Sequence, residues 1–317
     1  MDNINLINQN MKKRLFILSL FVLALALSQT KAQGLFIKVQ PGYGLALSSS
    51  NFGVNVTYTN TQTITTETES FKYENVKGSY GNGLNVGASI GYMFNEYMGA
   101  ELGIGYHIGG SYEVFSKGNS TSTMPPLPTV TSDTNRTTTY KANQFRLNPA
   151  IIITSGSEGL APYLKFGLVL GIGTKVSVSQ EYTSKTSVTA ESKSISEWEQ
   201  SGGMSIGLNG ALGATYSISD NISLFAELEI ISMSYAPTKQ SLVKYTIDGV
   251  DKLSTLKTYS IETEYVSDYS ATSQFPTPSE FDKPKQELKQ YVPFSSFGIN
   301  VGLQIKFGDS GSHRRRH

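Results

Sequence analysis

The chain has 317 residues and a formal net charge of +1, so no strong overall field favours nucleic acid or an anionic surface. Charged residues make up only 16%, against about a quarter in an average soluble domain. Cysteine is absent, which excludes disulfides, thiolate metal sites, a cysteine nucleophile and a lipidated N-terminal cysteine.

The N-terminal segment has the pattern of a secretory signal. The basic stretch MKKR at 11–14 is followed by an apolar run at 15–27 and a small-residue stretch that ends at Ala32. The apolar run is shorter than the roughly 20 residues of a spanning helix, so an uncleaved anchor fits less well. We therefore expect residues 1–32 to be a signal peptide, with 1–10 as a candidate mis-start.

The mature chain alternates between two kinds of segment, and the kind described next predicts β-strands. Eight segments combine glycine with apolar residues at every second position. They are residues 35–46, 83–94, 97–108, 143–154, 160–173, 204–218, 222–235 and a last strand that ends at 307. The connections alternate between four long loops (48–82, 110–142, 174–203 and 236–293) and three short turns. The pattern predicts an all-β fold, an eight-stranded antiparallel up-and-down barrel over residues 33–307, because outer-membrane barrels have short periplasmic turns and long surface loops.

The two faces of these strands predict which side meets lipid. In the last strand, FGINVGLQIKF, every second residue from Phe297 to Phe307 is apolar, and the other parity carries glycine, amides and Lys306. A narrow interior needs glycine at many positions so that a few long polar side chains fit. The charges of these side chains must pair. We therefore expect the apolar face to point outward and a polar network to fill the lumen. The predicted network is Lys38, Glu101, His107, Arg146, Lys165, Glu227, Glu229 and Lys306, with Gln40 and Gln304 on the same parity.

These strands, the signal and the closing GINVGLQIKF resemble the small outer-membrane β-barrels of the OmpA-like and OmpX-like family. The resemblance covers residues 34–307 as a pattern and implies that Phe307 is the terminal aromatic read by the barrel-assembly machinery. The chain departs from the family by continuing with GDSGSHRRRH, a polar and basic tail at 308–317.

The long loops carry β signals of their own. Loops 48–82 and 174–203 alternate with threonine and valine, and Asp248-Gly249 is typical of a type I′ hairpin turn. We expect all strands except the third and fourth to extend above the membrane as β-ribbons. The loops also hold many aromatic residues, which either pack the ribbons together or contact a partner.

The sequence has no pattern of a catalytic or metal site. It lacks G-x-S-x-G, P-loop, EF-hand and metal-spaced histidine motifs. Only His107 lies within the predicted fold, and Glu101 shares its parity, which makes the two a candidate lumen acid/base pair. Such residues more often form ion pairs that fill the barrel interior, so we expect no enzyme activity, no cofactor and no metal.

The expected function is that of a non-enzymatic barrel of the cell outer membrane, acting in envelope integrity or in surface contact through its loops. The expected partners are outer-membrane lipid, the barrel-assembly machinery and an extracellular or host molecule, with no nucleic acid and a monomeric state. Three alternatives stay open: a narrow pore for small solutes, a lipid-modifying barrel enzyme that uses His107, and a soluble lipocalin-like ligand binder.

Overall fold

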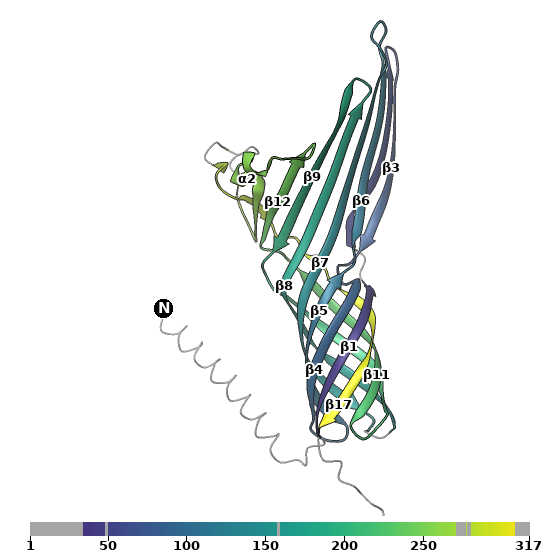
Figure 1. Ribbon diagram of the computed structural model, residues 1–317, viewed down its shortest axis with the longest axis vertical. Helices are drawn as coiled ribbons and strands as arrows, with labels where there is room; N and C mark the ends of the chain where they lie inside the picture. The colour runs from purple at the N-terminus through teal and green to yellow at the C-terminus, as the bar shows by residue number, and fades with distance from the viewer. Residues whose placement is uncertain (1–33, 48–49, 157–158, 271–276, 278–279, 308–317) are drawn as a thin grey trace, which may run out of the picture.

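The computed structural model describes residues 34–47, 50–156, 159–270, 277 and 280–307, and these form an all-β fold (Figure 1). Its strands are β1 (Gly34–Ala46), β2 (Ser50–Thr63), β3 (Glu67–Gly78), β4 (Gly83–Met93), β5 (Met98–Gly109), β6 (Tyr112–Thr123), β7 (Val130–Thr154), β8 (Leu160–Thr186), β9 (Thr189–Ser201), β10 (Ser205–Ser217), β11 (Ile222–Tyr235), β12 (Lys239–Ile247), β13 (Val250–Asp251), β14 (Glu262–Val266), β15 (Lys285–Leu288), β16 (Val292–Pro293) and β17 (Ser296–Phe307). The helices are η1 (Leu253–Thr255) and α2 (Thr258–Ile261). Within the described ranges no helix is long and apolar enough to span a bilayer.

A closed circuit of antiparallel pairings forms a barrel at one end of the molecule. β1 pairs with β4, and the pairing continues through β5, β7, β8, β10, β11 and β17. β17 then pairs back with β1 from Leu35↔Phe307 to Ala46↔Ser296. Closure removes the free sheet edges that an open sheet of these strands would expose.

An upright open sheet stands on the barrel and is built from the regions between its strands (Figure 1). Its order is β3, β2, β6, β7, β8, β9, β12, β14 and β15, and the pairings β2–β6 and β14–β15 are parallel. β7 and β8 have 25 and 27 residues and belong to both parts. This upper sheet is therefore continuous with the barrel wall.

Side chains alternate strictly between the inside and the outside of the barrel. β11 shows this best, because exposed and buried residues alternate along its whole length. The outward set is apolar and exposed, and Leu224, Leu228 and Ile230 are typical members. A register shift between Asn143 and Phe145, opposite Gly173 with its positive φ of 59°, resets the alternation where β7 and β8 leave the barrel.

The fold confirms the all-β class and the hairpin turn in the last loop. Ile247 pairs with Val250, and Asp248 and Gly249 have φ values of 51° and 80°, as a type I′ turn requires. The prediction of eight strands is wrong as a count, because the described chain forms 17 strands in one sheet. Several of the predicted long loops fold as strands of the upper sheet, since their alternating Thr, Ser and Tyr side chains suit a sheet exposed to water. Loop 110–142, for which no ribbon was expected, contributes β6 and the first half of β7.

Two predicted segments lie outside the described residues. These are the signal peptide at 1–32 and the basic tail at 308–317, and both remain predictions.

Candidate functional site: the barrel interior

The inward parity of the barrel strands brings charged side chains together in its lower half. Lys38 on β1 lies 3.0 Å, Nζ to Oε2, from Glu101 on β5. Lys165 on β8 lies 2.8 Å from Glu227 on β11 and 3.7 Å from Glu101, so the four charges form one chain. All four side chains are at most 5% exposed. Buried charges of this kind persist only when they are paired and hydrogen-bonded, and here they balance.

Neutral donors complete the coordination of the carboxylates. The Tyr163 hydroxyl donates to Glu227 Oε2 at 2.8 Å. Asn300 Nδ2 lies 3.0 Å from Glu227 Oε1 and 2.9 Å from Glu229 Oε2, and Asn209 Nδ2 donates to Glu229 Oε1 at 2.7 Å. Asn300 thus links the ion-pair chain to the next layer of the interior.

The upper polar layer is centred on Arg146 of β7. Its Nε donates to Gln144 Oε1 at 3.1 Å, and its Nη1 donates to Asn85 Oδ1 at 3.1 Å. Gln144 in turn donates to Thr174 and Ser205, at 2.9 and 2.8 Å. These contacts tie β7 to β4, β8 and β10 at one level of the barrel, which fixes Arg146 across the lumen.

His107 connects this layer to the segment between β3 and β4. Its Nδ1 lies 2.8 Å from Asn85 Oδ1, and its Nε2 lies 2.7 Å from the backbone oxygen of Tyr80. The side chain is fully buried. His107 therefore holds the Tyr80 segment in the barrel mouth and does not meet Glu101, whose partners are Lys38 and Lys165.

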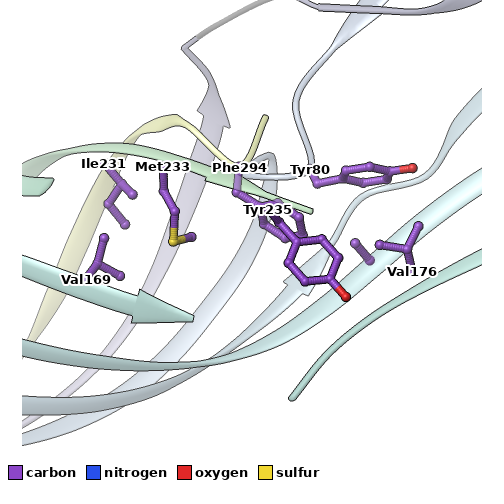
Figure 2. Close-up of a cluster of buried hydrophobic side chains, with 8 residues drawn as sticks. Tyr80, Val169, Val176, Ile231, Met233, Tyr235 and Phe294 are labelled. Carbon is purple, nitrogen blue, oxygen red and sulfur yellow. The ribbon is translucent and has the colours of Figure 1, made fainter. Parts of the chain in front are cut away.

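An apolar cluster closes the barrel mouth above the polar layers (Figure 2). Tyr80 and Phe294 come from the segments before β4 and β17, and their ring centroids are 5.4 Å apart. Phe294 also meets Tyr235 of β11 edge to face at 5.8 Å. Its backbone N–H donates to the Met233 oxygen at 2.9 Å, and the Tyr80 N–H donates to the Pro293 oxygen at 2.9 Å. Both segments are thereby tied to the wall and to each other.

A second apolar cluster lies at the opposite end of the barrel. Phe36, Ile152 and Tyr163 are buried there, and Met93 packs against them. The Lys38 ammonium lies 4.7 Å from the Tyr163 ring centroid, a cation–π distance that joins the cluster to the ion pairs. A cavity of about 70 Å³ opens beside this cluster.

Between the two charged layers the interior holds a small polar cavity of about 40 Å³. It is lined by Ser89, Asn148, Asn209 and Arg146, whose Oγ, Oδ1, Oδ1 and Nη2 atoms have no protein partner among the described residues. A cavity of this size accommodates a few water molecules, and such groups are usually satisfied by water. The lumen is thus filled by layers and contains no wide channel in the part of the chain that the structure describes.

The structure places the predicted interior residues as follows. Lys38, Glu101, His107, Arg146, Lys165, Glu227 and Glu229 are all buried inside the barrel. Lys306 is half-buried at the end that holds Phe36, and Phe307 is 47% exposed on the outer face of β17. The two apolar clusters that close the barrel were not predicted from the sequence. Phe36 and Tyr163 could have been found because they share the parity of Lys38 and Lys165, whereas Tyr80 and Phe294 lie between strands and carry no periodic signal.

A family model of known proteins matches this chain. The model of the outer membrane protein β-barrel domain matches residues 17–250, which is well over half of the chain. A search of curated proteins finds no match. Among solved structures the chain is similar to the outer membrane protein OprG from Pseudomonas aeruginosa, with 13% identity and a TM-score of 0.38. That alignment covers 87% of this chain and 97% of the other.

Proposed function

We propose that the eight strands of the closed circuit span the outer membrane as a sealed, non-enzymatic barrel, because this chain belongs to the outer membrane protein β-barrel family. The protein resides in the cell outer membrane. The barrel in this proposal anchors the upright sheet, and the sheet makes contacts at the cell surface. The proposal gives the spanning part the layout of the OmpA-like and OmpX-like barrels, which its strand pattern resembles.

The filled lumen is the observation that carries the proposal. A solute would have to displace the Phe36 cluster, the chain of ion pairs, the Arg146 layer and the Phe294 cluster in turn. Leaving one buried charge without its partner costs about 3–5 kcal/mol. A passage that needs all four layers to open is therefore rarely populated.

The outer face of the barrel supports a position in lipid. Ile104 and Leu212 are exposed by 62% and 57%, which would be costly in water and is favourable against acyl chains. The aromatic residues Tyr43 and Phe145 are exposed beside the upper sheet, and Tyr216 and Phe307 are exposed at the other end. Aromatic residues at both rims are typical of membrane barrels.

The direction of insertion follows from the turns. Both ends of the described barrel, Gly34 and Phe307, lie at the end with the short turns. Bacterial outer-membrane barrels place short turns in the periplasm and long connections outside. The upper sheet in this proposal therefore faces the cell exterior.

Planar-bilayer recording of the folded protein tests the sealed lumen. We expect baseline current at neutral pH, provided that heat-modifiable gel migration shows the protein to be folded. Discrete conductance steps would overturn the sealed barrel and favour the narrow pore.

Cysteine labelling on intact cells tests the direction, because the chain has no cysteine of its own. Val188, 65% exposed between β8 and β9, and Tyr97, 55% exposed in a short turn, are matched positions at opposite ends. A membrane-impermeant maleimide should label Val188→Cys on intact cells and Tyr97→Cys only after the outer membrane is broken. The reverse pattern would overturn the proposed exterior sheet.

A further inference from the structure

β3 forms one edge of the upper sheet. It pairs with β2 along Ser50↔Gly78 to Gln62↔Glu67, and this is its one ladder among the described strands. Figure 1 shows β3 at the outer margin of the sheet, running from the far tip down to the barrel. A strand edge of this length leaves a row of backbone N–H and C=O groups open to pairing with another chain.

The side chains of β3 are suited to a contact. Every residue from Glu67 to Asn75 is exposed. Phe71 and Tyr73 are 49% and 61% exposed, and their rings are parallel with centroids 6.0 Å apart. Tyr58 of β2 extends this row, 4.7 Å from Phe71. An exposed aromatic row beside an open edge is the arrangement that strand addition covers, since main-chain bonds supply affinity and side chains supply specificity.

The charge pattern of β3 complements that of a second β3 laid antiparallel to it. When a second β3 is laid antiparallel with Tyr73 opposite Tyr73, Glu69 faces Lys77 and Lys72 faces Glu74. Each of these opposite-charge pairs occurs twice by the two-fold symmetry, and no like charges meet. Directly opposed cross-strand charges of opposite sign stabilise a strand pair, and like charges destabilise it.

The direction of β3 decides where the second copy lies. Copies in one membrane all have β3 running toward that membrane, so a two-fold axis along the membrane normal would pair the strands in parallel. That arrangement sets Glu69 beside Glu69 and Lys72 beside Lys72, and it is disfavoured. Antiparallel pairing instead requires a copy that points the opposite way, as in a facing membrane.

We propose that β3 docks on β3 of a second copy of this chain held in a facing membrane, which joins the two upper sheets edge to edge. The inference rests on the proposed exterior sheet and names its partner. Within one membrane the protein stays monomeric, in keeping with the like charges of the parallel arrangement.

Vesicle tethering with charge reversal tests the pairing. The protein is inserted into phosphatidylcholine vesicles, and the outward fraction is measured by maleimide labelling of Val188→Cys in every sample, so a failure of insertion is seen separately. Vesicles with the wild-type pattern should cluster, and vesicles with Glu69→Lys or with Lys77→Glu alone should not.

A mixture of the two variant populations should cluster again. The lysine introduced by Glu69→Lys in one copy then faces the glutamate introduced by Lys77→Glu in the other, and the native Lys77 and Glu69 of the two copies also meet. Absence of wild-type clustering at normal outward insertion, or absence of rescue in the mixture, would overturn the proposal.

Disulfide trapping tests the register. Tyr73→Cys lies on the two-fold axis, where paired Cα atoms are about 4.5–5.5 Å apart, within reach of a disulfide. Mild oxidation of clustered vesicles should link Tyr73→Cys between two vesicle populations. Ser70→Cys, which faces Val76, should not link to itself. Efficient linking at Ser70, or linking of Tyr73→Cys within single vesicles only, would contradict the antiparallel contact.

Discussion

Lys165 and Glu227 face each other inside the barrel with 2.8 Å between Nζ and Oε1, and neither side chain is more than 5% exposed. Each also bonds a second group, since Lys165 lies 3.7 Å from Glu101 and Glu227 accepts from Tyr163. The pair is thus the centre of the interior and not an isolated bridge. Removing one member leaves a buried charge without its main partner.

Glu227→Ala should therefore lower the free energy of unfolding by about 3–5 kcal/mol. The measurement is urea unfolding of the reconstituted protein, followed by the heat-modifiable gel band. Lys244→Ala is the matched control, because its 2.8 Å bridge to Glu197 is 48% and 40% exposed. Loss of such an exposed pair should cost less than about 1 kcal/mol. Equal effects of the two variants would contradict a buried, coupled network of ion pairs.

Gly91 of β4 faces the Phe36 ring inside the barrel, where a Cβ would overlap it. Gly91→Ala should therefore cost about 1–3 kcal/mol by overpacking. Gly210→Ala is the control, since its Cβ would meet its nearest neighbour, the Lys165 oxygen, only at 4.0 Å. Adding Phe36→Leu to Gly91→Ala should recover part of the loss in the same urea experiment. No difference between Gly91→Ala and Gly210→Ala would show that Phe36 does not pack there.

The barrel strands could be predicted from sequence because lipid on one side and a crowded lumen on the other enforce a period of two. The predicted strand at 222–235 has the same bounds as β11, and the parity of Lys38 and Glu227 places both of them inside. The upper sheet was harder to predict. The residues of β6 and of the first half of β7 are half-buried or exposed and mostly polar on both faces, so no apolar periodicity marks them, and pairings such as Tyr112↔Tyr140 depend on backbone bonds.

The partners within the interior could not be predicted, because they depend on strand stagger and not on spacing along the chain. Glu101 and His107 share a parity on β5, yet Glu101 bonds Lys38 across 63 residues. His107 lies higher in the barrel and meets Tyr80, which no pattern marked. The same holds for Phe294, whose position follows from the tie between its N–H and Met233.

Tyr140 gives a pH dependence in the upper sheet, above the spanning segment. Burial raises the pKa of its phenol above the ordinary value of about 10. The unfolded chain therefore loses this proton first, and stability present below pH 10 falls as pH rises through the folded pKa. Tyr140→Phe should remove part of that alkaline loss in urea unfolding at a series of pH values. Identical alkaline slopes for wild type and variant would show that the phenol is not protected.

His107→Ala tests whether this residue positions the mouth segment or performs chemistry. The substitution removes the contacts to Asn85 and to the Tyr80 oxygen, so a polar group in the barrel mouth is left without its His107 partner, at a cost of about 1–3 kcal/mol. Amides of the Tyr80–Gly83 segment should exchange hydrogen faster, while those of the Asp248-Gly249 turn, far from the mouth, should be unchanged. The envelope-lipid profile of cells that carry the variant should equal that of the wild type. A changed lipid profile with unchanged amide exchange would contradict the positioning role and favour a lipid-modifying enzyme.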